Sequence, residues 1–223
     1  MLSTDEIAKH LANYGVSATP LQCDQVKAYI ALLLKWNRSI SLTSITDELE
    51  ILSFHFGESA FALSRIHGMN GRLADVGSGA GFPGLALRIF GADLEVALIE
   101  SNARKCAFLS EAVRQLRLDA VRVLRSRFED EASQLHASFD FVVSRALGGY
   151  ADLLSWSREA LKPSGRVILW LGLKDVNATM QIPGWNWQPP ISIPGSTQRY
   201  LLVSSPGTDS VDSNEEVPKA GIV

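Results

Sequence analysis

The stretch LADVGSGAGFPGLAL, residues 73–87, decides the fold of this chain. A short apolar run at 72–76 passes into a glycine-rich loop, and the loop continues into a helical pattern at 84–90. The loop glycines are Gly77, Gly79, Gly81 and Gly84. Because glycine has no Cβ, its backbone can adopt left-handed conformations and approach a ligand closely. A loop of this kind between a strand and a helix directs backbone N–H groups and the positive end of the helix dipole at a ligand.

The region around this loop alternates between short apolar runs and helical patterns. The apolar runs lie at 72–76, 94–99, 120–124, 139–143 and 166–171, and the helical patterns lie at 84–90, 102–117 and 150–161. This alternation is typical of a parallel sheet covered by helices. Two further runs, 186–193 and 199–204, flank Pro194-Gly195 and predict a closing antiparallel hairpin. We therefore expect an α/β fold with a mostly parallel sheet.

Residues 1–70 carry helix signals and no strand pattern. The signals are Ser3 with Glu6 before the first helix, and Thr19, Pro20 and Gln22 before the second. The first pair and the Thr19–Gln22 pair have capping-box spacing, and proline favours the first position of a helix. Mixed spacings of three and four between apolar residues predict two more short helices within 47–67. We expect an N-terminal helical cap over 1–70 and an α/β domain over 71–204.

The composition excludes several classes of protein. The 223 residues are 46% apolar and 20% charged, with no secretory leader pattern and no apolar run near the length of about 18 residues that a membrane span needs. Cys23 and Cys106 lie far apart, so neither a disulfide framework nor a metal site is indicated. The net charge of −3 resides in 205–223, whose polar, acidic composition predicts a flexible tail. We expect a cytoplasmic protein without a metal.

The glycine pattern permits two kinds of ligand. The last three loop glycines have dinucleotide-binding spacing, and Glu100 follows about 20 residues on, where an acid can accept both hydroxyls of a ribose. This spacing alone permits NAD. Asp75 favours S-adenosylmethionine instead, because a carboxylate at the strand end would attract the ammonium of a methionyl group and repel a pyrophosphate. The additional Gly77 lets such a ligand pack flat against the backbone.

Basic side chains gather in residues 101–127. This segment holds seven Lys and Arg residues and two acidic residues, which gives it a net charge of +5. Such a run forms either a solvated helix face or a surface that contacts nucleic-acid phosphates. The next segment, SRFED at 126–130, follows the third strand at the sheet edge where an adenine would lie. Phe128 can offer this adenine an apolar face, or it belongs to the core.

Six segments in order resemble one bacterial enzyme family. They are LLKWNRSISLTSI (33–45), HFGES (55–59), LADVGSGAGFPGLAL (73–87), IESNARKCAFL (99–109), SRFED (126–130) and FDFVVSRAL (139–147). The chain thereby resembles the RsmG family, also called glucose-inhibited division protein B, which methylates N7 of a guanine in small-subunit ribosomal RNA with S-adenosylmethionine. The resemblance implies a class I methyltransferase fold, Rossmann-like, with a mostly parallel seven-stranded sheet and an N-terminal helical extension. It also implies cofactor contacts from Gly77, Phe82, Phe128, Glu129 and Arg145.

Two positions depart from the pattern of that family. Glu58 stands where the family usually has Asp, which keeps the charge on a longer side chain. Leu171 replaces a usual Lys before a glycine, and Lys174 could substitute if the chain turns there. Arg145 could pair with Glu129, with the cofactor carboxylate or with a phosphate. These departures leave the methyl donor unaffected and weaken the assignment of the substrate.

The sequence thus predicts a methyltransferase that modifies N7 of a guanine in 16S ribosomal RNA, free or in the small-subunit particle, and acts as a monomer. A methyltransferase with a small-molecule substrate and a non-catalytic RNA-binding module are the alternatives. No catalytic side chain is expected, because N7 carries a free lone pair, and a lone His55 is more often a packed residue than a base. The expected cofactor contacts are Asp75, Gly77, Gly79, Gly81, Phe82, Glu100, Phe128, Glu129 and Arg145, and the expected RNA contacts are Arg104, Lys105 and Arg199.

Overall fold

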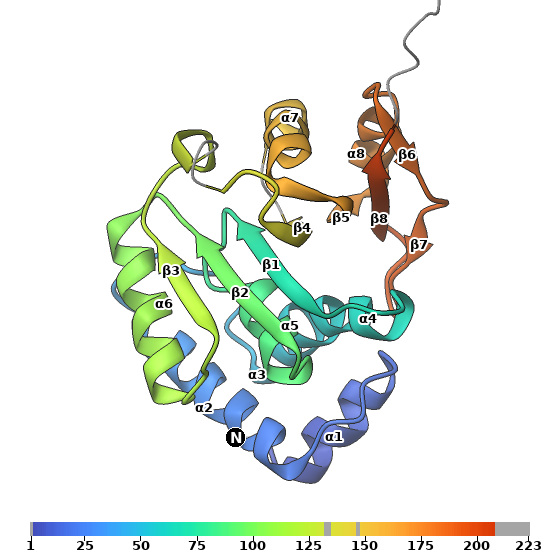
Figure 1. Ribbon diagram of the computed structural model, residues 1–223. Helices are drawn as coiled ribbons and strands as arrows, with labels where there is room; N and C mark the ends of the chain where they lie inside the picture. Colours follow the sequence, from blue (N-terminus) through green and yellow to red (C-terminus); the bar gives the residue numbers. More distant parts are fainter. Residues whose placement is uncertain (1, 132–134, 146–147, 208–223) are drawn as a thin grey trace, which may run out of the picture.

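A single mixed sheet forms the centre of the molecule (Figure 1). The computed structural model describes residues 2–131, 135–145 and 148–207. The strand order is β3-β2-β1-β4-β5-β8-β6, and β7 pairs with another part of β8. The first five strands are parallel and β8 is antiparallel to β5. The strands are β1 (Gly71–Val76), β2 (Leu94–Ile99), β3 (Val121–Leu124), β4 (Phe139–Arg145), β5 (Leu161–Gly172), β6 (Trp185–Trp187), β7 (Ile191–Ser192) and β8 (Arg199–Pro206).

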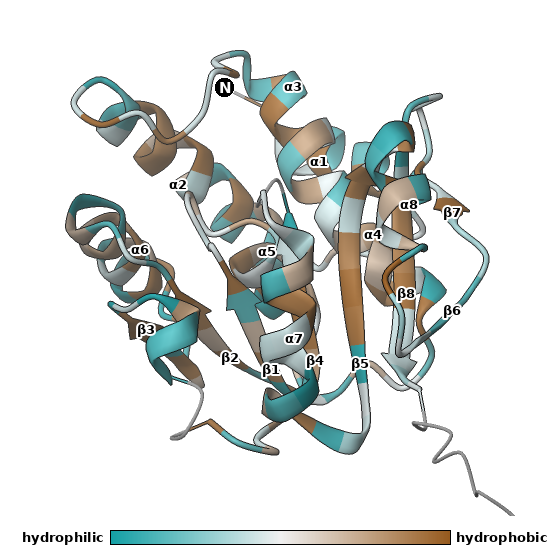
Figure 2. Ribbon diagram, turned by 90° about the horizontal axis from the view of Figure 1, so that it is seen from above, coloured by the Kyte–Doolittle hydropathy of each residue, from teal (hydrophilic) through white to brown (hydrophobic). Residues whose placement is uncertain are grey.

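Helices cover both faces of the sheet. They are α1 (Thr4–Ala12), α2 (Pro20–Asn37), α3 (Glu48–Ile51), the π-helical turn η1 (Leu52–Gly57), α4 (Glu58–Arg65), α5 (Gly84–Phe90), α6 (Ala103–Gln115), the 3-10 turn η2 (Phe128–Glu131), α7 (Tyr150–Ala160) and α8 (Leu173–Thr179). One buried cluster contains side chains of α1 to α6, and a second contains side chains of α7 and α8. Figure 2 shows hydrophobic residues along the central strands between these layers.

The N-terminal helices share a core with the sheet. Ile7 of α1 and Tyr29 of α2 belong to the same buried cluster as Leu73 of β1 and Val203 of β8. Both predicted capping boxes are present, at Ser3 and at Thr19. The predicted cap therefore packs against the α/β part through one continuous core.

The predicted α/β fold is confirmed, and the strand count needs a correction. The five expected parallel strands and the three helices between them occur within a few residues of their predicted ranges. Over the described residues, the sheet has eight strands, whereas the sequence predicts seven. Both β6 and β7 pair with β8, and Pro189-Pro190 separates them. Because proline lacks an N–H, it interrupts the edge strand, and two short strands share the seventh position.

Three elements were not predicted, and one boundary moves. The two short helices predicted within 47–67 are present as α3 and α4, joined by the π-helical turn η1, whereas the sequence does not predict that turn, α8 or η2. The last strand, β8, ends at Pro206, past the expected boundary at 204, so the predicted tail does not begin at 205. The acidic part of that tail, 208–223, lies outside the described residues.

Candidate active site

The glycine loop leaves β1 with its backbone in the left-handed region. The φ angles are +71° at Gly77, +56° at Gly79 and +83° at Gly81. Among the described residues, a Cβ at Gly79 would have only the carbonyl oxygen of Gly77 within 4 Å, at 3.7 Å. Protein atoms therefore leave the space over Gly79 open, and its glycine suits an approach of a ligand to the backbone.

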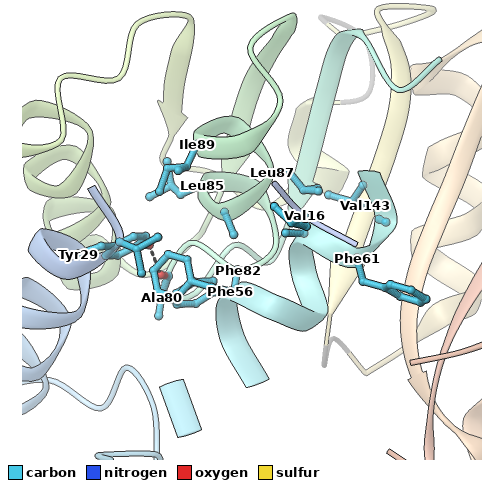
Figure 3. Close-up of a cluster of buried hydrophobic side chains, with 14 of the residues drawn as sticks. Val16, Tyr29, Phe56, Phe61, Ala80, Phe82, Leu85, Leu87, Ile89 and Val143 are labelled. Atoms are coloured by element: carbon cyan, nitrogen blue, oxygen red, sulfur yellow. Dashed lines mark hydrogen bonds between the residues drawn. The ribbon is translucent and has the colours of Figure 1, made fainter. Parts of the chain in front are cut away.

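Gly81 is required by packing inside the protein. A Cβ at this position would overlap the hydroxyl of Tyr29 on α2 and lie 2.7 Å from Leu85 Cδ1. The Tyr29 hydroxyl donates a hydrogen bond of 2.5 Å to the carbonyl oxygen of Ala80 (Figure 3). A side chain at this position would point toward α2, and the predicted contact of Gly81 with the cofactor stays a prediction. Its role is to let the helical layer hold the loop.

An aromatic stack supports the other side of the loop. The ring of Phe82 lies between Tyr29 and His55, with centroid distances of 5.3 and 4.7 Å and interplanar angles of 13° and 14°. Phe56 meets Phe82 edge-on at 5.1 Å (Figure 3). Such contacts fix ring positions beyond what apolar burial alone achieves. These rings thus support the loop in the absence of a ligand.

Two adjoining cavities open at the carboxyl edge of the sheet. The larger has a volume of about 360 Å³ and is lined by Gly77, Ile99, Glu100, Ser101, Lys105, Arg127, Phe128 and Glu129. The smaller has about 220 Å³ and is lined by Leu42, His55, Gly77, Ser78, Gly79, Ala80, Phe82, Lys105 and Arg145. Gly77 and Lys105 line both cavities, which together form the glycine-loop cleft. In open α/β sheets, ligands bind at this edge. A further cavity of about 560 Å³ lies at the amino ends of β1 to β3, away from the loop.

Seven of the nine predicted cofactor contacts line the glycine-loop cleft. They are Gly77, Gly79, Phe82, Glu100, Phe128, Glu129 and Arg145. Phe128 also meets Trp156 edge-on, with a centroid distance of 5.8 Å. Contact between these side chains and the cofactor stays a prediction. Asp75 and Gly81 do not line the cleft.

Glu100 ties the loop to the start of α6. One carboxylate oxygen accepts a hydrogen bond of 2.9 Å from the N–H of Gly79, and the other accepts one of 2.7 Å from the N–H of Asn102. Each carboxylate oxygen can accept more than one hydrogen bond. The side chain therefore positions the loop and retains lone pairs for the predicted ribose hydroxyls.

Asp75 lies buried beneath the loop. The residue is 0% exposed, and its Oδ2 accepts a hydrogen bond of 3.0 Å from the N–H of Gly84. Its Oδ1 has no hydrogen-bond partner among the residues that the structure describes. Burial raises the pKa of this carboxyl from 3.8 to about 7, against the opposing hydrogen bonds. The carboxylate is not exposed to the cleft in this structure, and its direct contact with the methionyl ammonium stays a prediction.

The raised pKa of Asp75 predicts an unusual pH dependence of stability. The unfolded carboxyl ionises near pH 4 and the folded one near pH 7. The fold therefore favours the neutral form, and stability should decrease as pH rises from about 4 to about 7 and then level off. Replacing Asp75 by Asn removes this titration. Between about pH 5 and pH 8, the melting temperature of the unmodified chain should fall by several degrees more than that of the variant.

Asp140 provides the control for this measurement. Hydrogen bonds from Lys162 and from the N–H of Arg72 hold the pKa of Asp140 below its usual value, although partial burial opposes them. Its contribution to stability is lost only in acid and is constant between about pH 5 and pH 8. Asp140→Asn should shift the melting temperature equally at both pH values. If Asp75→Asn did the same, the titration would not reside at Asp75.

A buried carboxylate joins the cleft to the C-terminal strands. Glu58 is 2% exposed, and its Oε1 accepts hydrogen bonds from Arg199 at 2.7 Å, while Oε2 lies 3.7 Å from Arg145. Arg145 also donates to the carbonyl oxygen of Phe54 in η1. From the sequence, Glu129 is one candidate partner of Arg145. This prediction is wrong, because the guanidinium of Arg145 pairs with Glu58. In the sequence, Glu58 stands out only as a departure from the family pattern.

The three predicted RNA contacts lie in different surroundings. Arg104 is exposed at the start of α6. Lys105 follows it but lines the glycine-loop cleft. Arg199 is bound to Glu58 and lies over the ring of Phe54, with 4.5 Å between the guanidinium carbon and the ring centroid. Arg104 faces solvent, as a phosphate contact requires, and RNA contacts at Lys105 and Arg199 stay predictions.

The departure at Leu171 also has a structural setting. Leu171 is 2% exposed and packs in the cluster beneath α7 and α8. The chain turns at Gly172 into α8, which exposes Lys174. Lys174 does not line the neighbouring cavity, so it does not replace the usual lysine there.

His55 is a packed residue, as its isolated position in the sequence predicts, and it forms part of the cleft wall. Its Nε2 shares a hydrogen bond of 2.8 Å with Thr43 Oγ1, and its ring stacks on Phe82. Burial, with a smaller effect of Arg145, lowers the pKa of His55 to about 3. The imidazole is therefore neutral at physiological pH and serves as a wall of the cleft.

The described residues contain neither a candidate metal cluster nor a candidate membrane span. Within residues 2–131, 135–145 and 148–207, no group of three or more His, Cys, Asp or Glu side chains could hold a metal ion. In the same ranges, no helix combines the length and hydropathy needed to cross a bilayer.

Comparisons with known proteins agree with this geometry. The family model described as rRNA small subunit methyltransferase G (GidB) matches residues 22–181. Ribosomal RNA small subunit methyltransferase G of Pseudomonas fluorescens is 32% identical over 89% of this chain and 93% of its own, and that of Geobacter sp. is 37% identical over 80% of each chain. A SAM-dependent methyltransferase from Aquifex aeolicus shares the fold, with a TM-score of 0.57 and 17% identity over 70% of this chain and 92% of that chain. The resemblance found in the sequence is thereby confirmed, and the chain belongs to the rRNA small subunit methyltransferase G family.

Proposed function

We propose that this protein transfers a methyl group from S-adenosylmethionine to N7 of a guanine in 16S ribosomal RNA. Membership of a small-subunit rRNA methyltransferase family supports the reaction class and the RNA substrate. The observation that carries the proposal is the glycine-loop cleft at the carboxyl edge of the sheet, whose lining histidine, His55, has a pKa lowered to about 3 and is therefore a very weak base. An acceptor atom that needs no deprotonation suits such a site.

The residues of the cleft fit the proposed methyl donor. The space over Gly79 is open, and an aromatic side chain, Phe128, lines the larger cavity for an adenine. Glu100 lies at the end of β2 and can accept hydrogen bonds from a ribose. Arg145 lines the smaller cavity, where a methionyl carboxylate would find a positive charge. The donor is therefore expected to span both cavities.

Methyl transfer to guanine N7 requires alignment and no general base. When bound, the donor supplies a methyl group on a sulfonium: the N7 lone pair forms the bond to carbon, the carbon–sulfur electron pair remains on sulfur, and the positive charge moves to the guanine ring. Rigid support of the loop by Tyr29, Phe82 and His55 is what this chain contributes to alignment. Orientation of two reactants can supply about 7–11 kcal/mol of a barrier in favourable cases.

Phosphate contacts at the mouth of the cleft would hold the RNA. Arg104 is exposed beside Lys105 at the start of α6, so an RNA backbone that crosses this helix end meets two positive side chains. We propose that a monomer acts in the cytoplasm, on 16S ribosomal RNA or the small-subunit particle. A guanine in a loop is the easiest to splay into such a cleft.

Transfer of tritiated methyl groups from S-adenosylmethionine to unmethylated 16S ribosomal RNA and to small-subunit particles tests this proposal. The product should be cleaved at one guanine by borohydride and aniline, because N7 methylation makes the ring labile. Methyl transfer only to small acceptors, or RNA binding without transfer, would reject the proposed substrate or the enzyme itself. A labelled product that resists cleavage would reject N7.

The neutral His55 predicts a flat pH profile. With the donor saturating, the single-turnover rate should be nearly constant from about pH 6.5 to 8.5, where an unperturbed histidine base would titrate. His55→Ala should lower the rate only modestly, because it removes a wall of the cleft and no proton acceptor. A rate that rises about tenfold per pH unit would mean that the acceptor atom first loses a proton.

A further inference from the structure

A third cavity continues from the glycine-loop cleft toward the C-terminal strands. Its volume is about 360 Å³, and it is lined by Glu58, Arg145, Tyr150, Trp170, Leu171, Gly172, Asp175 and Arg199. Arg145 lines this cavity as well as the smaller cavity of the cleft. The space therefore begins where the cleft ends, between the ends of β4 and β5 and the starts of α7, α8 and β8. We call it the β5 pocket.

The walls of the β5 pocket are largely fixed. Trp170 is 5% exposed, and its indole N–H donates a hydrogen bond of 2.8 Å to the carbonyl oxygen of Glu58. Two arginines engage the Glu58 carboxylate, as described above. Tyr150 is half-buried at the start of α7. The pocket thus combines aromatic surface with an ion-paired floor, which suits a flat, polar ring.

Asp175 is the uncommitted carboxylate of this pocket. It lies in the first turn of α8, and its Oδ2 is 3.9 Å from the position of a Cβ on Gly172, so the side chain turns back over the end of β5. Over the part of the chain that the structure describes, no donor forms a hydrogen bond or an ion pair with it. Its negative charge and burial together raise the pKa of Tyr150, burial contributing more. Asp175 is exposed, so an acceptor pair that is hydrated and has no protein donor among the described residues lies at the rim of the pocket.

The donors that match this carboxylate belong to guanine. Guanine presents N1–H and the N2 amino group side by side, and a carboxylate accepts two such parallel hydrogen bonds. Adenine presents an acceptor at N1, which a carboxylate repels. Inosine keeps N1–H and lacks the amino group. A carboxylate in this position would thus read the edge of the ring away from N7.

We propose that the β5 pocket receives the target guanine and that Asp175 recognises its N1–H and N2 amino edge while N7 faces the glycine-loop cleft. This inference rests on the proposed function and adds the residue that selects the base. A site built to pair a substrate donor discriminates against an analogue without it, because the acceptor is then left without a partner. An acid in the first turn of a helix also stabilises the helix, so the test must separate the two roles.

The test compares guanine with inosine at one position. The aniline cleavage described above locates the target, and full-length 16S ribosomal RNA is then ligated from transcribed pieces and a synthetic segment with guanine or inosine at that site. For the unmodified chain, kcat/KM should be at least about tenfold higher with guanine. In Asp175→Asn, kcat/KM with guanine should fall by about tenfold or more, and the two RNAs should differ by less than about twofold.

Asp152→Asn is the matched control. Asp152 is an exposed acid in the first turn of α7 and does not line the pocket, so this variant should retain the preference for guanine. The affinity for S-adenosylmethionine, measured by calorimetry, should be unchanged in both variants. A purely structural role of Asp175 would lower the melting temperature and leave the guanine-to-inosine ratio intact, which would overturn the inference. Absence of methylation at any guanine would instead reject the proposed function.

Discussion

Replacement of Gly79 by Val should lower the affinity for S-adenosylmethionine by about a hundredfold or more, a loss of roughly 2.7 kcal/mol. The backbone of Gly79 has a φ of +56°, which a β-branched residue adopts only with strain. The N–H of this residue also holds Glu100 at 2.9 Å. A valine that shifts the loop to relieve the strain breaks this hydrogen bond, and one that stays in place fills the cleft. Calorimetric titration with S-adenosylmethionine measures either result.

Gly195→Val separates backbone strain from the loss of ligand space. Gly195 has a φ of +74° in the turn before β8, and no atom of the described residues lies within 4 Å of the position of a Cβ there. The two substitutions therefore impose similar strain in similarly open surroundings. We expect comparable losses in melting temperature and an affinity within about twofold of the unmodified chain for Gly195→Val. Equal losses of affinity in both variants would show that the cleft is not where the donor binds.

The glycine loop was predictable because its signal is local. The apolar run, the loop and the helical pattern stand next to one another in 73–87, and the left-handed conformations follow from the glycines themselves. Glu100 was predictable for the same reason, as the residue after a strand whose neighbour carries the loop. Sequence order and the rule that ligands bind at the carboxyl edge of a parallel sheet were sufficient.

The side that a strand residue faces was harder to predict. Asp75 lies near the end of β1, and the sequence predicts that its side chain points into the cleft. Side chains alternate between the two faces of a strand, and Leu73 packs in the cluster on the α5 side, whereas Ala74 and Val76 pack in the other cluster. Asp75 therefore faces α5, where it meets the N–H of Gly84. The alternation is present in the sequence, but the face that carries the loop is set only by packing.

Contacts between distant segments left no trace in the sequence. Glu58, Arg145 and Arg199 come from α4, β4 and β8, and no spacing rule connects them. Lys105 is a different case, because α6 starts at the carboxyl edge of the sheet and its first turn must lie beside the cleft. The charge of 101–127 predicts an RNA contact for Lys105, and the position of the helix start adds that it lies beside the cleft.

The largest expected loss of stability follows from removing the Glu58 carboxylate. Burial raises its pKa, but Arg145 and Arg199 both favour the charged form. In Glu58→Ala, these two guanidinium groups would face each other without the anion, and Arg145 is only 18% exposed. Removing one partner of a buried ion pair costs about 3–5 kcal/mol of stability. The lower end of this range applies here because the side chain of Arg199 is 37% exposed. The free energy of unfolding in urea measures this loss.

A surface pair of the same length provides the comparison. The distance between Glu111 and Arg114 is 2.6 Å, against 2.7 Å between Glu58 and Arg199, but Glu111 and Arg114 lie on the exposed face of α6. Glu111→Ala should change stability little, because solvent already screens the pair. If Glu58→Ala does not refold, Glu58→Asp keeps the charge on a shorter side chain and should show an intermediate loss. Similar small losses for Glu58→Ala and Glu111→Ala would mean that water enters around Arg145 and replaces the carboxylate. In that case the ion pair would not hold the cleft and the β5 pocket together.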